Sequence, residues 1–253
     1  MKKLTAGFIA KSISGELIQG FPEQEITGVS IDSRSIKEGE VFFAIRGENF
    51  DGHDFIIECI EKGARALVVE KIIDIVGEGK NITVIKVEDS TKALQELAKA
   101  YRLLLKGLKV IAITGSAGKT TTKDIIAALL GKRYRTRKTR GNLNNHYGLP
   151  LTLLDFDGDE EIAVLEMGMS QLGEISLLAE IAKPEIGVIT NVGETHLESL
   201  ISVENVAKGK SELIKALPAD GIAVLNYDNE YVREMSRVFP GKKIIYYGLT
   251  GEA

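Results

Sequence analysis

Cysteine is nearly absent from the sequence, and so are long apolar segments. Cys59 is the single cysteine among the 253 residues, so an internal disulfide framework is excluded. It lies in an apolar helical pattern, which favours a small core residue over a nucleophile. No apolar run approaches the ~20 residues of a membrane helix. Polar residues also interrupt the basic amino terminus where a signal peptide needs an apolar core. We therefore expect a cytoplasmic protein without membrane insertion.

An excess of positive charge is also lacking. The sequence has 32 lysines and arginines against 36 aspartates and glutamates, a formal net charge of −4, which argues against a nucleic-acid surface. One basic run, residues 132–140, follows a predicted helix. It is either a solvated turn or a positive wall beside a phosphate-bearing ligand, and we favour the second. The composition is that of a globular protein, which we expect to be a monomer.

The first 88 residues combine short apolar strands with a short helix. Strands are predicted at residues 26–31, 41–45, 66–69 and 82–87, and a helix at residues 54–62. This pattern predicts a small mixed α/β domain over residues 1–88. Asp89, Ser90 and Thr91 then form a cluster of N-cap residues. The apolar periodicity that follows them predicts a connector helix within residues 89–108.

From residue 109 onward, buried-type strands alternate with helices. Strands are predicted at residues 110–114, 162–167, 186–191, 222–226 and 244–247, and helices at residues 120–130, 175–182, 203–217 and 229–237. Such alternation predicts a doubly wound, mostly parallel sheet over residues 109–253. In these sheets, ligands bind at the carboxyl ends of the strands. The polar motifs of this region lie at those ends.

A glycine-rich turn between the first of these strands and its helix predicts a phosphate-binding loop. The turn consists of Gly115, Ser116, Ala117, Gly118, Lys119, Thr120 and Thr121. Its backbone N–H groups and the helix N-terminus would hold phosphates. Lys119 would reach the terminal phosphates, and the Thr120 hydroxyl would bind Mg²⁺. The loop is a variant, because Ile113 stands where the usual pattern has its first glycine.

Two further candidates follow neighbouring strands. Glu166 ends the strand at residues 162–167 and is a natural Mg²⁺ ligand, although a strand-end glutamate is more often a surface residue. His196 lies in the segment 190–197. A lone histidine is usually a capping or core residue, but its place at the same sheet edge favours a metal or phosphate role.

Two other segments leave their interpretation open. Lys208 and Lys210 lie on a predicted helix, where a solvated face is the usual explanation. Asn144 and Asn145 belong to a loop at residues 141–150 that is rich in asparagine and glycine. That loop either supplies amide hydrogen bonds to a ligand or is a plain polar connection.

Taken in order, the motifs resemble those of the Mur ligases of peptidoglycan synthesis. The matching patterns are Thr-Gly-x-x-Gly-Lys-Thr, Gly-Asn-x-Asn-Asn-x-x-Gly-x-Pro, Glu-Met-Gly, Thr-Asn-x-Gly-x-x-His and Ala-Lys-x-Lys. The segments 32–34, 39–44 and 50–55 resemble that family's UDP-sugar-binding N-terminal domain. Residues 109–253 would then be the ATP-binding central domain. Asn144, Asn145 and the segment 166–169 favour the branch that joins D-alanyl-D-alanine to UDP-N-acetylmuramoyl-tripeptide, over the branch that adds the third residue of the peptide.

The resemblance implies ATP and Mg²⁺ as cofactors and a role for each matching residue. Lys119 would hold the β- and γ-phosphates, Thr120 and Glu166 one Mg²⁺, and His196 a second. One lysine would be carbamylated and serve a metal, Lys210 in preference to Lys208. The proposed ligand contacts are Asn144 and Asn145 for ATP or the peptide, and Ser33, Arg34, Asp51, Gly52 and His53 for the UDP-sugar peptide.

The resemblance also implies a chemistry and exposes one departure. A Mur ligase activates a carboxylate with ATP as an acyl phosphate, which the incoming amine then attacks. Members of the family have three domains, whereas this sequence stops after the last predicted strand of the central domain. We therefore expect a chain that binds substrates but ligates poorly by itself. The alternatives are a non-catalytic fragment that binds nucleotide or UDP-sugar, and the related ligase that adds the third residue.

Overall fold

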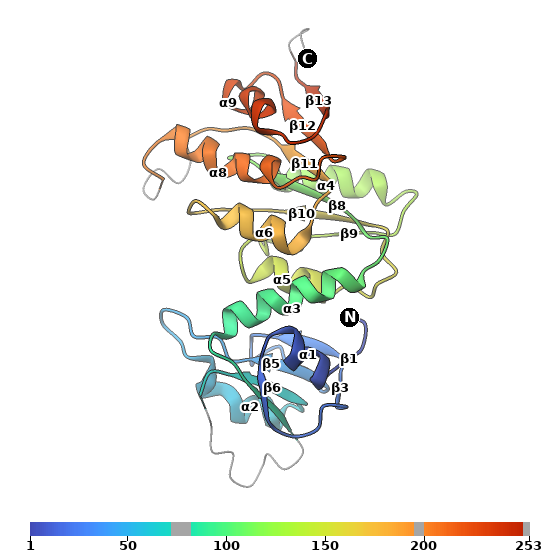
Figure 1. Ribbon diagram of the computed structural model, residues 1–253, viewed down its shortest axis with the longest axis vertical. Helices are drawn as coiled ribbons and strands as arrows, with labels where there is room; N and C mark the ends of the chain where they lie inside the picture. The colour runs from blue at the N-terminus through green and yellow to red at the C-terminus, as the bar shows by residue number, and fades with distance from the viewer. Residues whose placement is uncertain (72–81, 195–199, 250–253) are drawn as a thin grey trace. The chain divides into compact units, whose positions relative to one another are not determined.

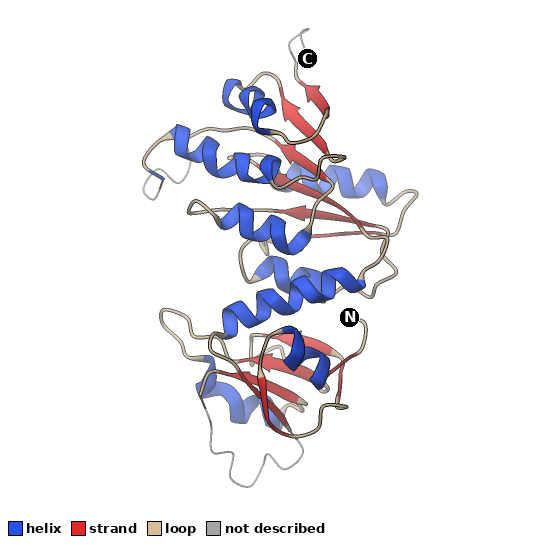
Figure 2. Ribbon diagram, in the orientation of Figure 1, coloured by secondary structure: helices blue, strands red, loops and turns tan. Residues whose placement is uncertain are grey.

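The computed structural model describes residues 1–71, 82–194 and 200–249 (Figures 1 and 2). The chain forms two compact units. The first is Met1–Leu104 with Leu153–Gly158, and the second is Leu105–Thr152 with the residues from Asp159 onward. The assignment of residues 1–88, 89–108 and 109–253 to a sugar-binding domain, a connector and an ATP-binding domain stays a prediction.

The first unit is built on a mixed five-stranded sheet. Its strand order is β2 (Glu16–Gln19), β7 (Thr83–Lys86), β6 (Ala66–Val69), β5 (Glu40–Phe43) and β4 (Gly28–Ser30). The pair β2–β7 is antiparallel and the other pairs are parallel. The helical elements are α1 (Ala6–Ser12), η1 (Gly52–Phe55), α2 (Ile56–Glu61) and α3 (Ser90–Leu104). This arrangement confirms the predicted small mixed α/β unit.

The core of this unit explains Cys59. The side chains of Phe42, Ile56, Cys59 and Leu67 are buried in one apolar cluster. Burial raises the pKa of the Cys59 thiol to about 12, so the thiolate that a nucleophile requires is not formed near neutral pH. The expectation of a core cysteine is confirmed.

One predicted strand of this unit is wrong as a single element. The alternating segment at residues 26–31 is divided between β3 (Glu25–Ile26) and β4. β3 pairs with β1 (Leu4–Thr5) in a separate two-stranded sheet, whereas β4 pairs with β5. Between them, the Thr27 N–H donates to the Gly39 carbonyl. The alternation of side chains continues through Thr27, so sequence pattern could not reveal the change of partner.

The second unit is a six-stranded sheet in which every pair is parallel. Its strand order is β13 (Lys243–Tyr247), β12 (Ile222–Asn226), β11 (Ile186–Ile189), β8 (Lys109–Thr114), β10 (Ile162–Glu166) and β9 (Thr136–Lys138). The helical elements are α4 (Lys119–Leu130), α5 (Gly148–Leu154, whose last two residues belong to the first unit), α6 (Glu174–Ala182), α8 (Val203–Lys215), α9 (Glu230–Glu234) and η2 (Met235–Val238). The predicted parallel, doubly wound sheet is confirmed.

Helices cover both faces of this sheet, as the strand β11 shows. Val188 packs in an apolar cluster with Ile126 and Leu130 of α4. The neighbouring residue, Gly187, faces Leu213 of α8, which lies 3.3 Å from where a glycine Cβ would be. Successive residues of a strand point to opposite faces, so α4 and α8 lie on opposite sides of the sheet.

The central position of β8 sets the location of the site. The chain leaves β8 for β9 and β10 on one side and later returns to β11 on the other. The strands β8, β10 and β11 are therefore neighbours, and they all run in the same direction. Their carboxyl ends meet at one edge, at the switch point where ligands bind in open parallel sheets. In the described part of the chain, no helix combines the length and apolarity needed to cross a bilayer.

Candidate functional site

The turn after β8 is held closed by the segment that follows β11. The Thr190 hydroxyl donates to the Ala117 carbonyl at 2.6 Å, and the Ala117 N–H donates to Asn191 Oδ1 at 2.8 Å. A Cβ at Gly115 would lie 1.8 Å from Thr190 Oγ1, so this close approach requires glycine. Gly118, with φ of 80°, caps α4 in the left-handed region.

Two further hydrogen bonds join the turn after β8 to the segment after β11. The Ser116 N–H donates to the Asn191 carbonyl at 3.0 Å, and the Gly193 N–H donates to Ser116 Oγ at 3.0 Å. The first half of the segment 190–197 thus positions the phosphate-loop turn. His196 lies outside the described residues, so its predicted metal role stays a prediction.

Lys119 folds back over its own turn. Its Nζ donates to the Gly115 carbonyl at 2.8 Å and to the Ser116 carbonyl at 3.4 Å. Burial lowers the pKa of Lys119, and the charge of Glu166 acts in the opposite direction. The ammonium therefore lies at the mouth of a turn whose backbone can bind an anion.

Glu166 connects three elements. Its Oε2 accepts from the Thr120 hydroxyl at 2.9 Å and lies 3.4 Å from Lys123 Nζ, while its Oε1 accepts from Asn144 Nδ2 at 2.9 Å. The Thr139 hydroxyl accepts a hydrogen bond from the Glu166 N–H. The side chain is 3% exposed. The structure thus brings together Thr120, Asn144 and Glu166, which belong to three separate sequence motifs.

The donor set around Glu166 has the chemistry of a magnesium site that is completed by a ligand. Thr120 and Glu166 offer one hydroxyl and one carboxylate on adjacent elements. Proteins commonly bind Mg²⁺ through one or two carboxylates together with phosphate oxygens and water. Within the described ranges, no group of three or more His, Cys, Asp or Glu side chains is placed to hold a metal. The residues present fit a cation that enters with a phosphate ligand.

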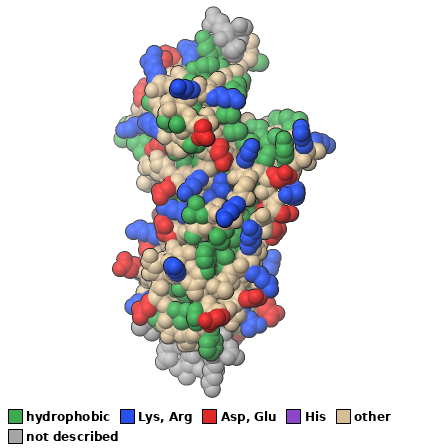
Figure 3. Space-filling view, turned by 45° about the vertical axis from the view of Figure 1, so that its right-hand side comes forward, with side chains coloured by type: hydrophobic (Ala, Val, Ile, Leu, Met, Phe, Trp, Pro, Cys, Tyr) green, Lys and Arg blue, Asp and Glu red, His purple; other side chains and the backbone are tan. Residues whose placement is uncertain are grey.

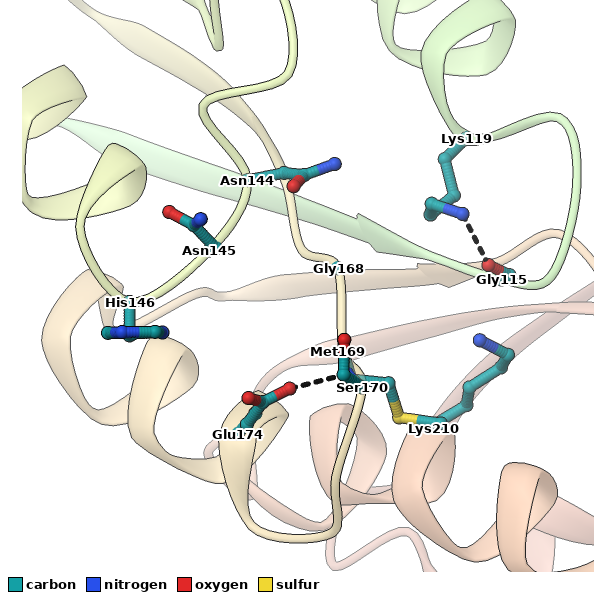
Figure 4. A pocket seen from close by; sticks show the side chains of 10 residues that line it. All are labelled: Gly115, Lys119, Asn144, Asn145, His146, Gly168, Met169, Ser170, Glu174 and Lys210. Atoms are coloured by element: carbon teal, nitrogen blue, oxygen red, sulfur yellow. Dashed lines mark hydrogen bonds between the residues drawn. The ribbon is translucent and has the colours of Figure 1, made fainter. Parts of the chain in front are cut away.

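A cavity of about 300 Å³ opens beside this cluster (Figure 4). The lining residues are Gly115, Lys119, Asn144, Asn145, His146, Gly168, Met169, Ser170, Glu174 and Lys210. Lys119 enters from α4 and Lys210 from α8, while the two asparagines come from the loop before α5. Two cationic side chains in one cavity suit an anionic ligand.

The structure distinguishes between the two candidate lysines. Lys210 is 2% exposed and lines the cavity. Burial, together with the charge of Lys119, lowers the pKa of Lys210 to about 8. Lys208 is exposed to solvent instead. The geometry therefore supports Lys210 as the lysine that acts in the cavity.

Several lining residues were not identified from the sequence. Glu174 Oε2 accepts from the Ser170 N–H at 2.5 Å and the Gln171 N–H at 3.1 Å, which fixes the loop after β10. His146 also lines the cavity, and its ring lies 4.0 Å from that of Tyr147. Glu174 could have been recognised as an acidic residue in the first turn of a helix at the same sheet edge.

Asn145 lines the cavity and also has a structural role. Its Oδ1 accepts from the Gly148 N–H at 2.8 Å and from the Tyr147 N–H at 3.2 Å. These bonds begin α5, a helix that the sequence pattern did not predict. The loop at residues 141–150 is therefore more than a plain connection, because Asn144 and Asn145 organise the strand edge and the next helix.

Several cations of the basic run at residues 132–140 are paired with carboxylates. Arg137 pairs with Glu160 at 3.6 Å, and Lys138 pairs with Asp124 at 2.9 Å. Part of the run is the edge strand β9. Figure 3 shows cationic and anionic side chains on one face of the molecule, with several cationic side chains gathered near its middle. These pairs favour a structural role over the positive wall that the sequence suggested.

The candidate sugar-contacting residues lie in the first unit. Arg34 is exposed, and its guanidinium makes two hydrogen bonds to Asp32, at 2.9 Å and 2.7 Å. The Arg34 side chain lowers the pKa of Asp32 to about 2. Ser33 is buried, and its carbonyl accepts from Lys62 at 2.8 Å. Arg34 is therefore held at the surface as the cationic half of an ion pair with Asp32.

Asp51 and His53 form an internal network. His53 Nδ1 lies 2.5 Å from Asp51 Oδ1, and Nε2 of the same ring accepts a hydrogen bond from the Glu70 N–H at 2.9 Å. Burial acts to raise the pKa of Asp51, but hydrogen bonds from His53 and Lys71 hold it well below its usual range. Gly52 lies between them at the start of η1. His53 is buried, so it shapes this turn and has no exposed ring to offer a ligand.

Comparison with known families identifies both units. A model described as "Mur ligase middle domain" matches residues 113–253, and one described as "Mur ligase family, catalytic domain" matches residues 25–102. The UDP-N-acetylmuramoyl-tripeptide–D-alanyl-D-alanine ligase of Bacillus subtilis is 46% identical over 225 residues, covering 88% of this chain and 49% of that protein. The Escherichia coli ligase of the same name is 36% identical, covering 96% and 52%.

Solved structures give the same result. MurF from Acinetobacter baumannii superposes with a TM-score of 0.91 at 32% identity, covering 98% of this chain and 54% of that one. MurF from Thermotoga maritima, solved in complex with ADP, has a TM-score of 0.78 at 38% identity, covering 88% and 51%. The chain spans about half the length of the relatives that it matches.

Proposed function

This chain belongs to the Mur ligase family, and from that membership we propose that it is the nucleotide- and UDP-sugar-binding part of an ATP-dependent ligase. The proposed reaction joins D-alanyl-D-alanine to UDP-N-acetylmuramoyl-tripeptide, as the names of its relatives say of those proteins. The observation that carries the proposal is the contact of Thr120 and Asn144 with Glu166. It joins three family motifs at one edge of the sheet.

The proposed chemistry begins with activation of a carboxylate. The terminal carboxylate of the tripeptide attacks the γ-phosphorus of ATP, the bond to the β–γ bridging oxygen breaks, and an acyl phosphate and ADP form. The amine of D-alanyl-D-alanine then attacks the acyl carbon, the nitrogen loses its proton, and phosphate leaves. Because two anions must approach each other, catalysis consists mainly of positioning and charge neutralisation.

The side chains of the cavity have separate tasks in this scheme. Lys119 would leave the Gly115 and Ser116 carbonyls to contact the β- and γ-phosphates, while the N–H groups at the start of α4 hold the phosphate oxygens. Thr120 and Glu166 would hold Mg²⁺, which supplies charge neutralisation for the phosphates. His196 is proposed as a ligand of a second Mg²⁺. Asn144 would keep the Glu166 carboxylate in place.

Lys210 is proposed as the carbamylated lysine. Carbamate formation requires a neutral amine that adds to carbon dioxide, and the lowered pKa of Lys210 increases the neutral fraction near physiological pH. The product is an anion in a cavity that also holds Lys119. In the first unit, Ser33, Arg34 and the turn Asp51–Gly52–His53 are proposed to bind the UDP-sugar peptide, with the buried His53 shaping the turn and not contacting the ligand through its ring. Arg34 would contact its phosphates through the guanidinium N–H groups that Asp32 does not use.

The nucleotide site is tested by Lys119→Ala in this chain. We expect the affinity for ADP with Mg²⁺, measured by calorimetry, to fall at least about tenfold, since a charge-assisted contact contributes roughly 1.5–3 kcal/mol. Lys109→Ala is the matched control, because Lys109 is exposed at the opposite end of β8 from the turn. Unchanged ADP affinity in Lys119→Ala would refute the assignment of the loop.

The ligase proposal itself is tested by product formation. The chain is incubated with ATP, Mg²⁺, UDP-N-acetylmuramoyl-tripeptide and D-alanyl-D-alanine, and phosphate release is compared with that of a full-length relative. Because the chain spans about half of those relatives, we expect binding with slow turnover. A parallel reaction with a UDP-sugar dipeptide and a diamino acid tests the related ligase, and faster turnover there would favour that alternative.

A further inference from the structure

A buried lysine in α4 takes no part in the chemistry proposed above. Lys123 is the single buried residue of α4, a helix that is described throughout its length. Its side chain is 3% exposed. A buried ammonium is costly unless it is paired, so the position of Lys123 requires an explanation from its surroundings.

The surroundings identify Glu166 as its partner. Lys123 Nζ lies 3.4 Å from Glu166 Oε2 and 3.7 Å from Asp124 Oδ1. Asp124 is about half exposed and is paired with Lys138 at 2.9 Å. Glu166, in contrast, is as buried as Lys123 itself. The two charges therefore compensate each other within the protein interior.

The same oxygen of Glu166 serves two contacts of α4. Oε2 accepts from the Thr120 hydroxyl at 2.9 Å and faces Lys123 one helical turn further on. Asn144 contacts the other oxygen and is uncharged. Lys123 is thus the ion-pair partner of the carboxylate that is proposed to meet the metal.

We propose that Lys123 is a positioning residue that acts as the resident counter-ion of Glu166 and sets how strongly nucleotide binding depends on a divalent cation. The inference rests on the proposed function, because it requires nucleotide phosphates beside Thr120. With Lys123 present, the carboxylate is neutralised before any metal arrives, and phosphates can enter the turn. Without Lys123, the carboxylate repels the phosphates unless a divalent cation accompanies them.

The test compares ADP affinity with Mg²⁺ and with a chelator, by calorimetry on the 253-residue chain. The measured quantity is the ratio of the two dissociation constants. We expect Lys123→Met to raise that ratio about tenfold over the unaltered chain, mainly by weakening metal-free binding. Lys123→Arg, which keeps the charge, should preserve the original ratio. Lys132→Met is the matched control, because Lys132 is exposed just beyond α4.

A second variant separates charge compensation from simple packing. Glu166→Gln removes the repelling carboxylate, so Lys123→Met should raise the ratio less in the Glu166→Gln background than in the unaltered chain. A packing role would instead weaken ADP equally with and without Mg²⁺, and that result would overturn the proposal. Circular dichroism establishes folding, and if Lys123→Met is unfolded, Lys123→Gln carries the same prediction.

The outcomes distinguish this inference from the proposed function. If the unaltered chain binds ADP with Mg²⁺ and Lys123→Met leaves the ratio unchanged, only the role of Lys123 is refuted. If the unaltered chain binds no ADP even with Mg²⁺, the nucleotide site and the inference both fall.

Discussion

A lysine that is closed off from water is costly to keep charged, and Lys210 is such a residue. It is 2% exposed, and the neighbouring ammonium of Lys119 opposes its charge further. Ligand sites often tolerate such a cost because the perturbed group is needed for the chemistry. The cost is set by burial and by the charge of Lys119, and it can be measured without any ligand.

Replacement of Lys210 should therefore stabilise the chain in a pH-dependent way. The pKa of Lys210 is lowered from 10.5 to about 8 in the folded protein. Between these two pH values the unfolded chain binds the extra proton, so the stability of the unaltered protein rises with pH. We expect Lys210→Met to be more stable by up to about 3 kcal/mol below pH 8, and the difference to vanish near pH 10.5.

The measurement is chemical denaturation across this pH range in buffers free of carbon dioxide. Lys208→Met is the control, because Lys208 is exposed, and it should change stability by less than about 0.5 kcal/mol at every pH. A gain for Lys210→Met that does not depend on pH would contradict a buried ammonium as its cause.

At the scale of elements, the sequence predicted the parts that have a strong period and a clear boundary. The strands at residues 66–69 and 222–226 were predicted with their observed bounds. The missed elements include α1, α5, β1, β2 and β9, which are short and begin from side-chain caps or lie at an edge. Thr5 begins α1 by accepting from the Phe8 N–H. Such contacts depend on backbone geometry that residue type alone does not determine.

The site residues that lie at the carboxyl ends of strands could be predicted from the sequence. The rule that parallel strands end at one edge placed Thr120 near Glu166, and the structure has their oxygens 2.9 Å apart. Lys123 could not be identified, because a lysine in a helix is normally exposed. The role of His53 was also beyond the sequence, since its burial depends on the tertiary fold of the first unit, in which the Glu70 N–H donates to its ring.

The phosphate-loop turn supplies a prediction at this scale. In Gly115→Ala the new Cβ would lie 1.8 Å from Thr190 Oγ1, so the turn must move away from the segment after β11. Overpacking of this kind costs about 1–3 kcal/mol. If the substitution destabilises the nucleotide-binding conformation of the turn by this free energy, the affinity for ADP with Mg²⁺ drops by roughly ten- to a hundredfold.

Calorimetry on Gly115→Ala and on Gly47→Ala checks this expectation. Gly47 is the control, because the nearest atom to its added Cβ is 3.6 Å away. If Gly115→Ala retains its ADP affinity, the close contact between Gly115 and Thr190 is not required for binding.

For the whole molecule, the two units differ in how their polar side chains are used. In the first unit, Asp51 and His53 satisfy each other within a turn. In the second, Lys119, Lys210 and Glu174 project into one cavity. The family matches follow the same division, with residues 25–102 in one match and residues 113–253 in the other. We therefore expect nucleotide binding to protect the second unit more than the first.

Hydrogen exchange with ADP and Mg²⁺ tests that expectation. At a ligand concentration of about one hundred times Kd, binding should stabilise the folded state by about 2.7 kcal/mol. Because the lining residues all belong to the second unit, added protection should concentrate at residues 115–122, 141–148 and 166–174. The strands β4, β5 and β6 should change little. Protection that centres on those three strands would place the nucleotide in the first unit and contradict the assignment of the phosphate-loop turn.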